Sequence, residues 1–241
     1  MTVRLAMWSG PRNISTAMLR SFESRDDSFV TDEPLYSHYL KVTGVDHPGR
    51  DEVIAHHESD WRRVVAWLTG PVPGGREVWY QKHMSHHLLP GIDRAWVGEL
   101  TNCFLVRDPR EMLASLAKVT PSPTLADTGL PQQAELFEQV RISTSRTPSV
   151  VDAKDVLLDP RRTLGLLCTA AGIDFQDSML TWAPGRRATD GIWAEHWYGA
   201  VERSTGFTPY RPKGDDLPER LEPLLAECEK LYAPLAEARL H

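Results

Sequence analysis

The sequence predicts an α/β protein with three layers, α/β/α, around a mostly parallel sheet. Short apolar runs typical of buried strands alternate with amphipathic segments typical of helices along its 241 residues. A strand, a tight loop and a helix follow one another at the N-terminus, and a second buried run leads directly into a helix near residue 110. Strands that alternate with helices in this way pair in parallel through helical crossovers.

The first loop has the character of an anion site. An apolar strand is expected at 3–8, and the helix that follows is expected from Ser15 to about residue 25. A loop at a helix N-terminus presents unpaired N–H groups and the positive end of the helix dipole, which suit phosphate or sulfate. Arg12 would add a charged donor, and Ser15 and Thr16 would add hydroxyls or a cap. The kinase-type loop is absent because no Lys is present, and an ordinary capped turn explains these residues equally well.

The next elements follow from apolar periodicity and from Gly and Pro breakers. Helical spacing of apolar residues predicts one amphipathic helix over 51–68, ended by the Gly- and Pro-rich stretch 70–75. Asp32 precedes Pro34 and is expected to cap the helix that begins there. Strands are expected at 28–31, 77–81 and 101–106.

A second anion-binding element follows the strand expected at 101–106. Arg107 stands at the carboxyl end of this strand, where open α/β sheets hold their ligands. Ser115 lies eight residues later, about two helical turns along. An arginine and a serine so placed can clamp a second phosphate. Taken alone, Arg107 is better explained by a salt bridge to Asp108 or Glu111, and Ser115 by a helix-packing contact.

The C-terminal half continues the alternation. Helices are expected at 130–144, 160–171 and 218–239, with a strand at 149–152. The stretch 183–213 is rich in Gly, Pro and Trp and has little periodicity, so we expect a long functional loop region there.

Together these segments resemble the sulfotransferases that use 3′-phosphoadenosine 5′-phosphosulfate (PAPS). Residues 11–16, Pro-Arg-Asn-Ile-Ser-Thr, are similar to the family's 5′-phosphosulfate loop, usually Pro-Lys/Arg-Ser-Gly-Thr-Thr, although Asn and Ile replace Ser-Gly. Arg107 and Ser115 have the spacing of its 3′-phosphate motif. Residues 150–164 resemble a strand-then-helix segment of the family, and 197–207 the late cofactor-covering loop of a bacterial branch.

The resemblance covers most of the chain and implies its organisation. It implies a single sulfotransferase domain over 1–241 with a P-loop-like nucleotide-binding fold, a helical insertion around 33–70 and the long loop region around 183–213. Phe207 is the aromatic residue expected to stack on the adenine. The cofactor-binding residues that it implies are Pro11, Arg12, Asn13, Ile14, Ser15, Thr16, Arg107, Ser115, Ser204, Thr205, Gly206 and Phe207.

The resemblance also implies the chemistry, which is PAPS-dependent sulfuryl transfer to a hydroxyl or amine of a small-molecule acceptor, with no metal required. Arg12 matches the family's cation at the leaving phosphate, and Lys82 matches the lysine that stabilises the transferring sulfuryl group. Glu33, at the end of the strand expected at 28–31, is the expected general base. His83 is its rival, although it stands one residue after Lys82 where the family's His stands two after.

Two other function classes stay open. A nucleotide or small-molecule kinase shares the architecture, but its loop Lys and Mg-binding Asp are not found at the expected places. A non-catalytic nucleotide-binding protein would keep the fold without the chemistry.

Composition and charge narrow the classes of binding partner that this chain can have. The net charge of −6 argues against nucleic acid, and no run approaches the ~20 apolar residues of a membrane span. The N-terminus leads straight into a strand without a signal-peptide pattern, so we expect a cytoplasmic protein. We also expect a monomer or homodimer. Cys103, Cys168 and Cys228 are expected to be reduced packing residues. His83 and His87 have helical chelate spacing, but a third metal ligand is lacking nearby.

Overall fold

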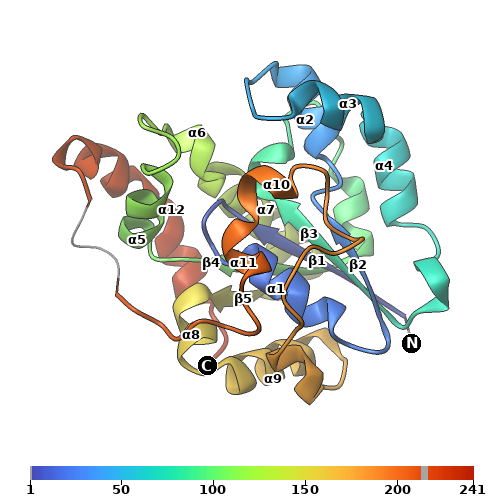
Figure 1. The fold of residues 1–241 in the computed structure, drawn as a ribbon. Coiled ribbons are helices and arrows are strands. Elements are labelled where there is room, and N and C mark those ends of the chain that lie inside the picture. Colours follow the sequence, from blue (N-terminus) through green and yellow to red (C-terminus); the bar gives the residue numbers. More distant parts are fainter. Residues whose placement is uncertain (1, 213–216) are drawn as a thin grey trace.

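The computed structural model describes residues 2–212 and 217–241, which form a five-stranded sheet between two layers of helices (Figure 1). The strand order is β2-β3-β1-β4-β5, and every neighbouring pair is parallel. The carboxyl ends of the strands therefore share one edge of the sheet. The strands are β1 (Val3–Ser9), β2 (Ser28–Asp32), β3 (Val78–Met84), β4 (Thr101–Val106) and β5 (Ser149–Asp152).

Each face of the sheet has its own apolar core. Helices α1 (Ser15–Glu23), α8 (Ala153–Leu158) and α9 (Pro160–Ala171) cover one face, where Phe22 stacks on Tyr80. Helices α4 (Trp61–Leu68), α7 (Leu130–Thr144) and α12 (Glu222–Glu237) cover the other. The expected three-layer α/β architecture is thus confirmed.

The remaining elements are short and lie around the sheet (Figure 1). The other α-helices are α2 (Tyr36–Thr43), α3 (Arg50–His56), α5 (Pro109–Leu116), α6 (Leu125–Thr128), α10 (Ala194–Trp197) and α11 (Gly199–Glu202). The 3₁₀ turns are η1 (Pro73–Gly75), η2 (Ser85–His87), η3 (Ala95–Glu99), η4 (Asp177–Leu180) and η5 (Glu219–Leu221).

Two local expectations are wrong. The single helix expected over 51–68 is two helices, α3 and α4, because the backbone of His57 is extended and Asp60 starts a new helix by accepting from the Arg62 N–H at 2.9 Å. Asp32 does not cap the helix after β2, since α2 begins only at Tyr36; its carboxylate instead accepts from Lys82 Nζ.

The late region expected at 183–213 is described up to residue 212 and is mainly irregular, with α10 and α11 as its helices. Figure 1 shows α11 beside α1 and α10 near the carboxyl end of β3. A buried ion pair ties this region to α1, with Arg20 Nη1 2.6 Å from Asp190 Oδ1. The late region therefore packs against α1.

The cysteines behave as expected of packing residues. Cys103, Cys168 and Cys228 are buried and free. Within the described residues, no helix combines the length and apolar character needed to cross a membrane.

Candidate active site

The loop between β1 and α1 has an unusual backbone. Arg12 and Ile14 both adopt left-handed conformations, with φ of 63° and 58°. Such conformations strain residues other than glycine, and they cluster at functional sites. Gly10 is required because a Cβ there would collide with the carbonyl oxygen of Thr128. The buried Asn13 donates Nδ2 to the Leu105 carbonyl at 3.4 Å and so anchors the loop to β4.

This loop leaves the start of α1 available to an anion. The N-cap position is Ile14, and no side chain among the described residues caps the helix there, so the expected capping by Ser15 or Thr16 does not occur. The first N–H groups of a helix otherwise lack partners and carry the positive end of its dipole. The loop therefore retains the features that bind phosphate or sulfate.

The two anion motifs expected from the sequence meet at one place. Arg12 Nε donates to Ser115 Oγ at 3.0 Å, and Arg107 Nη1 donates to the Arg12 carbonyl at 2.8 Å. Arg107 also pairs with Glu111 at 3.0 Å, and this is one of the two salt bridges that the sequence offered as a purely structural role for Arg107. Desolvation, with the charge of Arg107, lowers the pKa of Arg12. We call Arg12, Arg107, Glu111 and Ser115 the cradle; it holds two guanidinium groups, of which that of Arg107 pairs with the Glu111 carboxylate.

Tyr210 joins the late region to the cradle, and sequence reasoning missed it. Its hydroxyl donates to Glu111 Oε1 at 2.5 Å, and Lys154 Nζ lies 5.4 Å from its ring centre. The hydrogen bond to Glu111, with burial, raises the pKa of Tyr210 to about 12. Nothing in the sequence links Tyr210 to Glu111, because 99 residues separate them.

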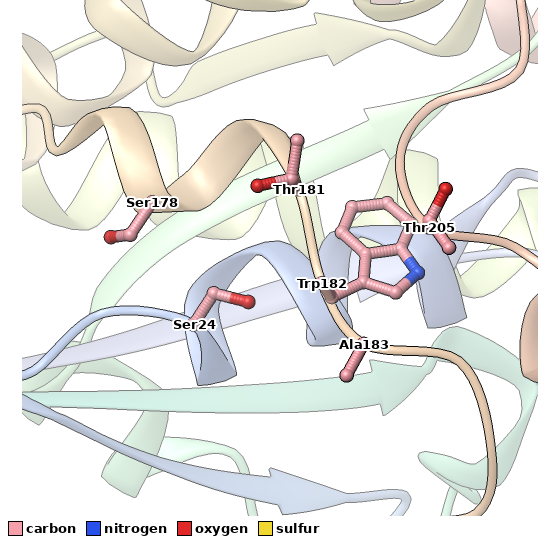
Figure 2. Close-up of a pocket in the computed structure, with 6 residues that line it drawn as sticks. All are labelled: Ser24, Ser178, Thr181, Trp182, Ala183 and Thr205. Carbon is pink, nitrogen blue, oxygen red and sulfur yellow. The ribbon is translucent and has the colours of Figure 1, made fainter.

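The segment Ser204–Phe207 is placed around Trp182. Trp182 Nε1 donates to Ser204 Oγ at 3.0 Å, Gly206 bridges to Thr181, and Phe207 packs edge-on against the Trp182 ring. Figure 2 shows Thr205 and Trp182 at a pocket of about 520 Å³ whose lining includes Ser24, just beyond the C-terminal end of α1. This pocket therefore lies at the opposite end of α1 from the cradle.

A second group of charges is buried at the ends of β2 and β3. Lys82 is 1% exposed and donates to Asp32 Oδ1 at 2.7 Å, Glu33 Oε1 at 2.6 Å and the Tyr198 hydroxyl at 2.6 Å. Asp32 and Lys82 are register partners in the sheet, and the Glu33 N–H donates to the Lys82 carbonyl. Glu33 also has a left-handed backbone, with φ of 42°. We call Asp32, Glu33, Lys82 and Tyr198 the lysine cluster.

The electrostatics of the lysine cluster favour a proton acceptor. Burial alone would lower the pKa of Lys82, but the carboxylates of Asp32 and Glu33 outweigh it, so the pKa lies well above its ordinary value. Burial raises the pKa of Glu33, and the charge of Asp32 adds to this while Lys82 opposes it. A carboxyl group with a raised pKa is a better base near neutral pH than an ordinary one.

Tyr198 and Asp32 are cluster members whose place sequence reasoning missed. The Tyr198 hydroxyl donates to Asp32 Oδ2 at 2.6 Å while it accepts from Lys82, and Trp193 Nε1 donates to it at 3.3 Å. The aromatic content of the late region is visible in the sequence, but it does not reveal which ring reaches β3.

The structure does not bring His83 to this cluster. Successive strand residues point to opposite faces, so His83 lies behind Lys82, stacked on Trp8 with ring centres 4.3 Å apart. It is 1% exposed, its Nε2 lies 3.3 Å from Gln81 Oε1, and burial lowers its pKa to about 3. The histidine that does lie beside Glu33 is His87. Throughout residues 2–212 and 217–241, no three His, Cys, Asp or Glu side chains gather as a metal site.

Comparison with known proteins relates this geometry to a family. A family model described as a sulfotransferase domain matches residues 3–234. Two curated proteins of Arabidopsis thaliana, branched-chain-amino-acid aminotransferase-like proteins 2 and 1, are 36% identical over 225 residues and 38% identical over 201 residues. The alignments cover 93% and 83% of this chain but 40% and 36% of the relatives, so the chain spans about two fifths of their length.

Solved structures share the fold at low sequence identity. The sulfotransferase domain from the curacin biosynthetic pathway superposes with a TM-score of 0.56 at 14% identity, over 98% of each chain. A sulfotransferase from Alicyclobacillus acidocaldarius gives 0.52 at 12% identity, over 98% of this chain and 96% of the other. Since the family model also spans nearly the whole sequence, this chain belongs to the sulfotransferase domain family.

Proposed function

We propose that this chain transfers a sulfuryl group from PAPS to a hydroxyl or amine of a small acceptor by in-line displacement. The observation that carries the proposal is the pairing of two different charge groups at one edge of the sheet. The cradle links two arginines, since Arg107 donates to the Arg12 carbonyl and pairs with Glu111, and the lysine cluster holds a carboxylate beside a buried lysine. The first suits an anionic donor, and the second suits removal of a proton from an acceptor.

The residues of the cradle fit the two anionic ends of PAPS. Arg12 and the uncapped first turn of α1 would hold the 5′-phosphosulfate. Arg107 and Ser115 would hold the 3′-phosphate, and Phe207 remains the residue predicted to meet the adenine. PAPS would supply an activated sulfuryl group, whose transfer needs no oxidation or reduction.

Arg12, Glu33 and Lys82 would have different roles in the transfer. Arg12 would stabilise the charge that grows on the leaving phosphate, and Glu33 would take the proton of the acceptor. Lys82 fixes one oxygen of Glu33 at 2.6 Å and would place a positive charge close to the reacting group. All three N–H groups of Lys82 already have partners, so Lys82 can reach a sulfuryl group only by releasing one of them.

Calorimetry with PAP, the 3′,5′-bisphosphate product, tests the donor assignment. We expect PAP to bind equally well with and without EDTA, and ATP–Mg to bind more weakly. In a thermal shift assay, a ligand at 100 times its Kd stabilises the protein by about 2.7 kcal/mol. Loss of PAP binding in EDTA, or a preference for ATP–Mg, would contradict the proposal and favour the kinase alternative.

A further inference from the structure

His87 is a buried histidine beside the carboxylate expected to act as base. It ends the turn η2, and its side chain is 3% exposed. Its Nδ1 lies 4.0 Å from Glu33 Oε2, and within the described part of the chain this nitrogen has no hydrogen-bond partner. Burial of a polar atom without a partner is costly. The position of Nδ1 therefore marks a place where a further polar group is expected to bind.

Glu33 presents its two oxygens to different neighbours. Oε1 accepts from Lys82 at 2.6 Å, whereas Oε2 is the oxygen that faces His87. A separation of 4.0 Å is too long for a direct hydrogen bond, but a third atom can stand about 2.8 Å from both oxygen and nitrogen. One hydrogen-bonding atom at that position would therefore contact both Glu33 Oε2 and His87 Nδ1.

Aromatic rings hold the imidazole in this orientation. Tyr36 stacks on His87 with ring centres 4.8 Å apart and an interplanar angle of 12°, and the Tyr39 ring centre lies 4.7 Å away. Trp193 packs edge-on against Tyr36. These rings give the surroundings of His87 an apolar, aromatic character.

The imidazole of His87 is neutral at physiological pH. Burial lowers its pKa well below the ordinary value, and the charges of His86 and Lys82 add to this effect. A neutral imidazole carries one N–H and one lone pair, and its tautomer follows its neighbours. The carboxylate oxygen beside Nδ1 favours the tautomer with the proton on Nδ1.

We propose that Glu33 Oε2 and His87 Nδ1 form the subsite for the reacting group of the acceptor, and that this group is a hydroxyl rather than an amine. The inference rests on the proposed function. A hydroxyl can donate to Oε2 and accept from Nδ1–H at once. An aliphatic amine is protonated near neutral pH and then offers donors alone. The pair therefore matches an alcohol. With a bound ammonium group, the Nδ1–H of His87 would face other N–H donors and would lack an acceptor.

With these two residues, every bond broken or formed in the transfer and the proton of the acceptor are accounted for. The O–H bond of the acceptor breaks and its proton passes to Glu33 Oε2, while the acceptor oxygen bonds to sulfur. The bond from sulfur to the 5′-phosphate oxygen breaks, and its electron pair remains on the phosphate of PAP. His87 keeps its proton throughout and holds the acceptor oxygen in line.

Matched probes test the inference. The protein is incubated with labelled PAPS and either 2-phenylethanol or 2-phenylethylamine, and we expect label on the alcohol and not on the amine. His87→Phe keeps a ring beside Tyr36 but lacks the donor, so kcat/KM for the alcohol should fall about 10- to 100-fold. His87→Asn retains a neutral donor and should recover most of this loss. His56→Phe, the same substitution at an exposed position of α3, is the control and should resemble wild type.

Nitrogen NMR of histidine-labelled wild-type protein gives a readout besides activity. In the PAP complex, 2-phenylethanol should shift the Nδ1 signal of His87, and 2-phenylethylamine should not. PAP binding without label on the alcohol or any His87 shift would overturn the subsite and leave the donor assignment intact. Equal labelling of the amine, or wild-type kcat/KM in a folded His87→Phe protein, would also overturn it. Absence of PAP binding would instead show that the proposed function itself fails.

Discussion

The cradle and the lysine cluster lie at the same edge of the sheet but are built on opposite electrostatic plans. In the cradle, Arg12 is exposed and the Arg107 side chain is 12% exposed, and the Glu111 carboxylate pairs with Arg107 and accepts from Tyr210 of the late region. In the lysine cluster, one ammonium group is buried with two carboxylates and a hydroxyl. Positive charge is in excess at the first place, and negative charge at the second.

The difference suits the roles proposed for the two places. A site that attracts a donor with two anionic ends gains from an excess of cations near solvent, because the ligand supplies the missing charge. A charge removed from water must instead be paired and hydrogen-bonded within the protein, or it is strongly destabilising. The pKa shifts agree with this division, since desolvation and Arg107 lower the pKa of Arg12 while two carboxylates raise that of Lys82.

The largest expected effect separates the two places by function. Glu33→Gln should lower turnover roughly 10²- to 10⁴-fold, the usual range for a lost general base, with PAP affinity near wild type. Labelled-PAPS assays and calorimetry measure the two quantities. His83→Asn, on the other face of β3, should change turnover much less. If His83→Asn abolished turnover while Glu33→Gln stayed active, the base assignment would be wrong.

The second prediction concerns the cradle alone. Arg107→Ala should weaken PAP binding by about 10²- to 10³-fold, because removing a charged partner of a phosphate typically costs several kcal/mol. Ser115→Ala should cost about 5-fold, as expected for one neutral hydrogen bond. The matched control is Arg110→Ala, whose guanidinium pairs with Glu222 on α12. Equal PAP affinity of the Arg107 and Ser115 variants would remove Arg107 from the clamp.

A Tyr→Phe substitution in the lysine cluster and one beside the cradle compare how much stability each place loses with a hydroxyl group. Tyr198→Phe removes a buried partner of Lys82 and Asp32 and should lower the free energy of unfolding by about 1–3 kcal/mol. Tyr210→Phe removes a bond to Glu111 near the surface and should cost clearly less. Urea unfolding of both variants checks this, and a larger loss for Tyr210→Phe would reverse the proposed contrast.

The smallest effect is a pH dependence behind the lysine cluster. The pKa of His83 is about 3 in the folded protein and about 6.5 when unfolded. Below pH 6.5 the unfolded state takes up a proton that the folded state refuses, so acid lowers stability. Between pH 7.5 and 5.5 wild type should lose about 1 kcal/mol more than His83→Asn. Urea unfolding at both values measures this, and equal losses would show that His83 does not resist protonation.

Much of the fold was predictable because its signals are local. Strand 101–106 and helices 130–144 and 160–171 match their expected bounds, since each has clear periodicity or a breaker such as Gly172. The helix expected over 51–68 was wrong because its apolar spacing continues across the break that the Asp60 cap creates. A side-chain cap inside a periodic segment is easily read as part of the helix.

The contacts of the candidate site were less predictable, because they join distant parts of the chain. Arg12, Arg107 and Ser115 could be named from motif spacing. In the structure Arg12 donates to Ser115, and Arg107 donates to the Arg12 carbonyl. Tyr198 is 116 residues from Lys82, and its place in the segment 197–207 predicts a cofactor cover and not a contact with Lys82. His83 and His87 could not be ranked from sequence, because only the strand's facing and the turn after it decide which one reaches Glu33.

Ile14 gives the anion loop a property that its sequence alone would not suggest. A β-branched residue with φ of 58° costs free energy where glycine would not, yet its side chain packs against the core beneath α1. That packing fixes a loop that glycine would leave free to move. The entropy lost in ordering the loop therefore falls on folding, and an anion that binds later meets N–H groups already in position.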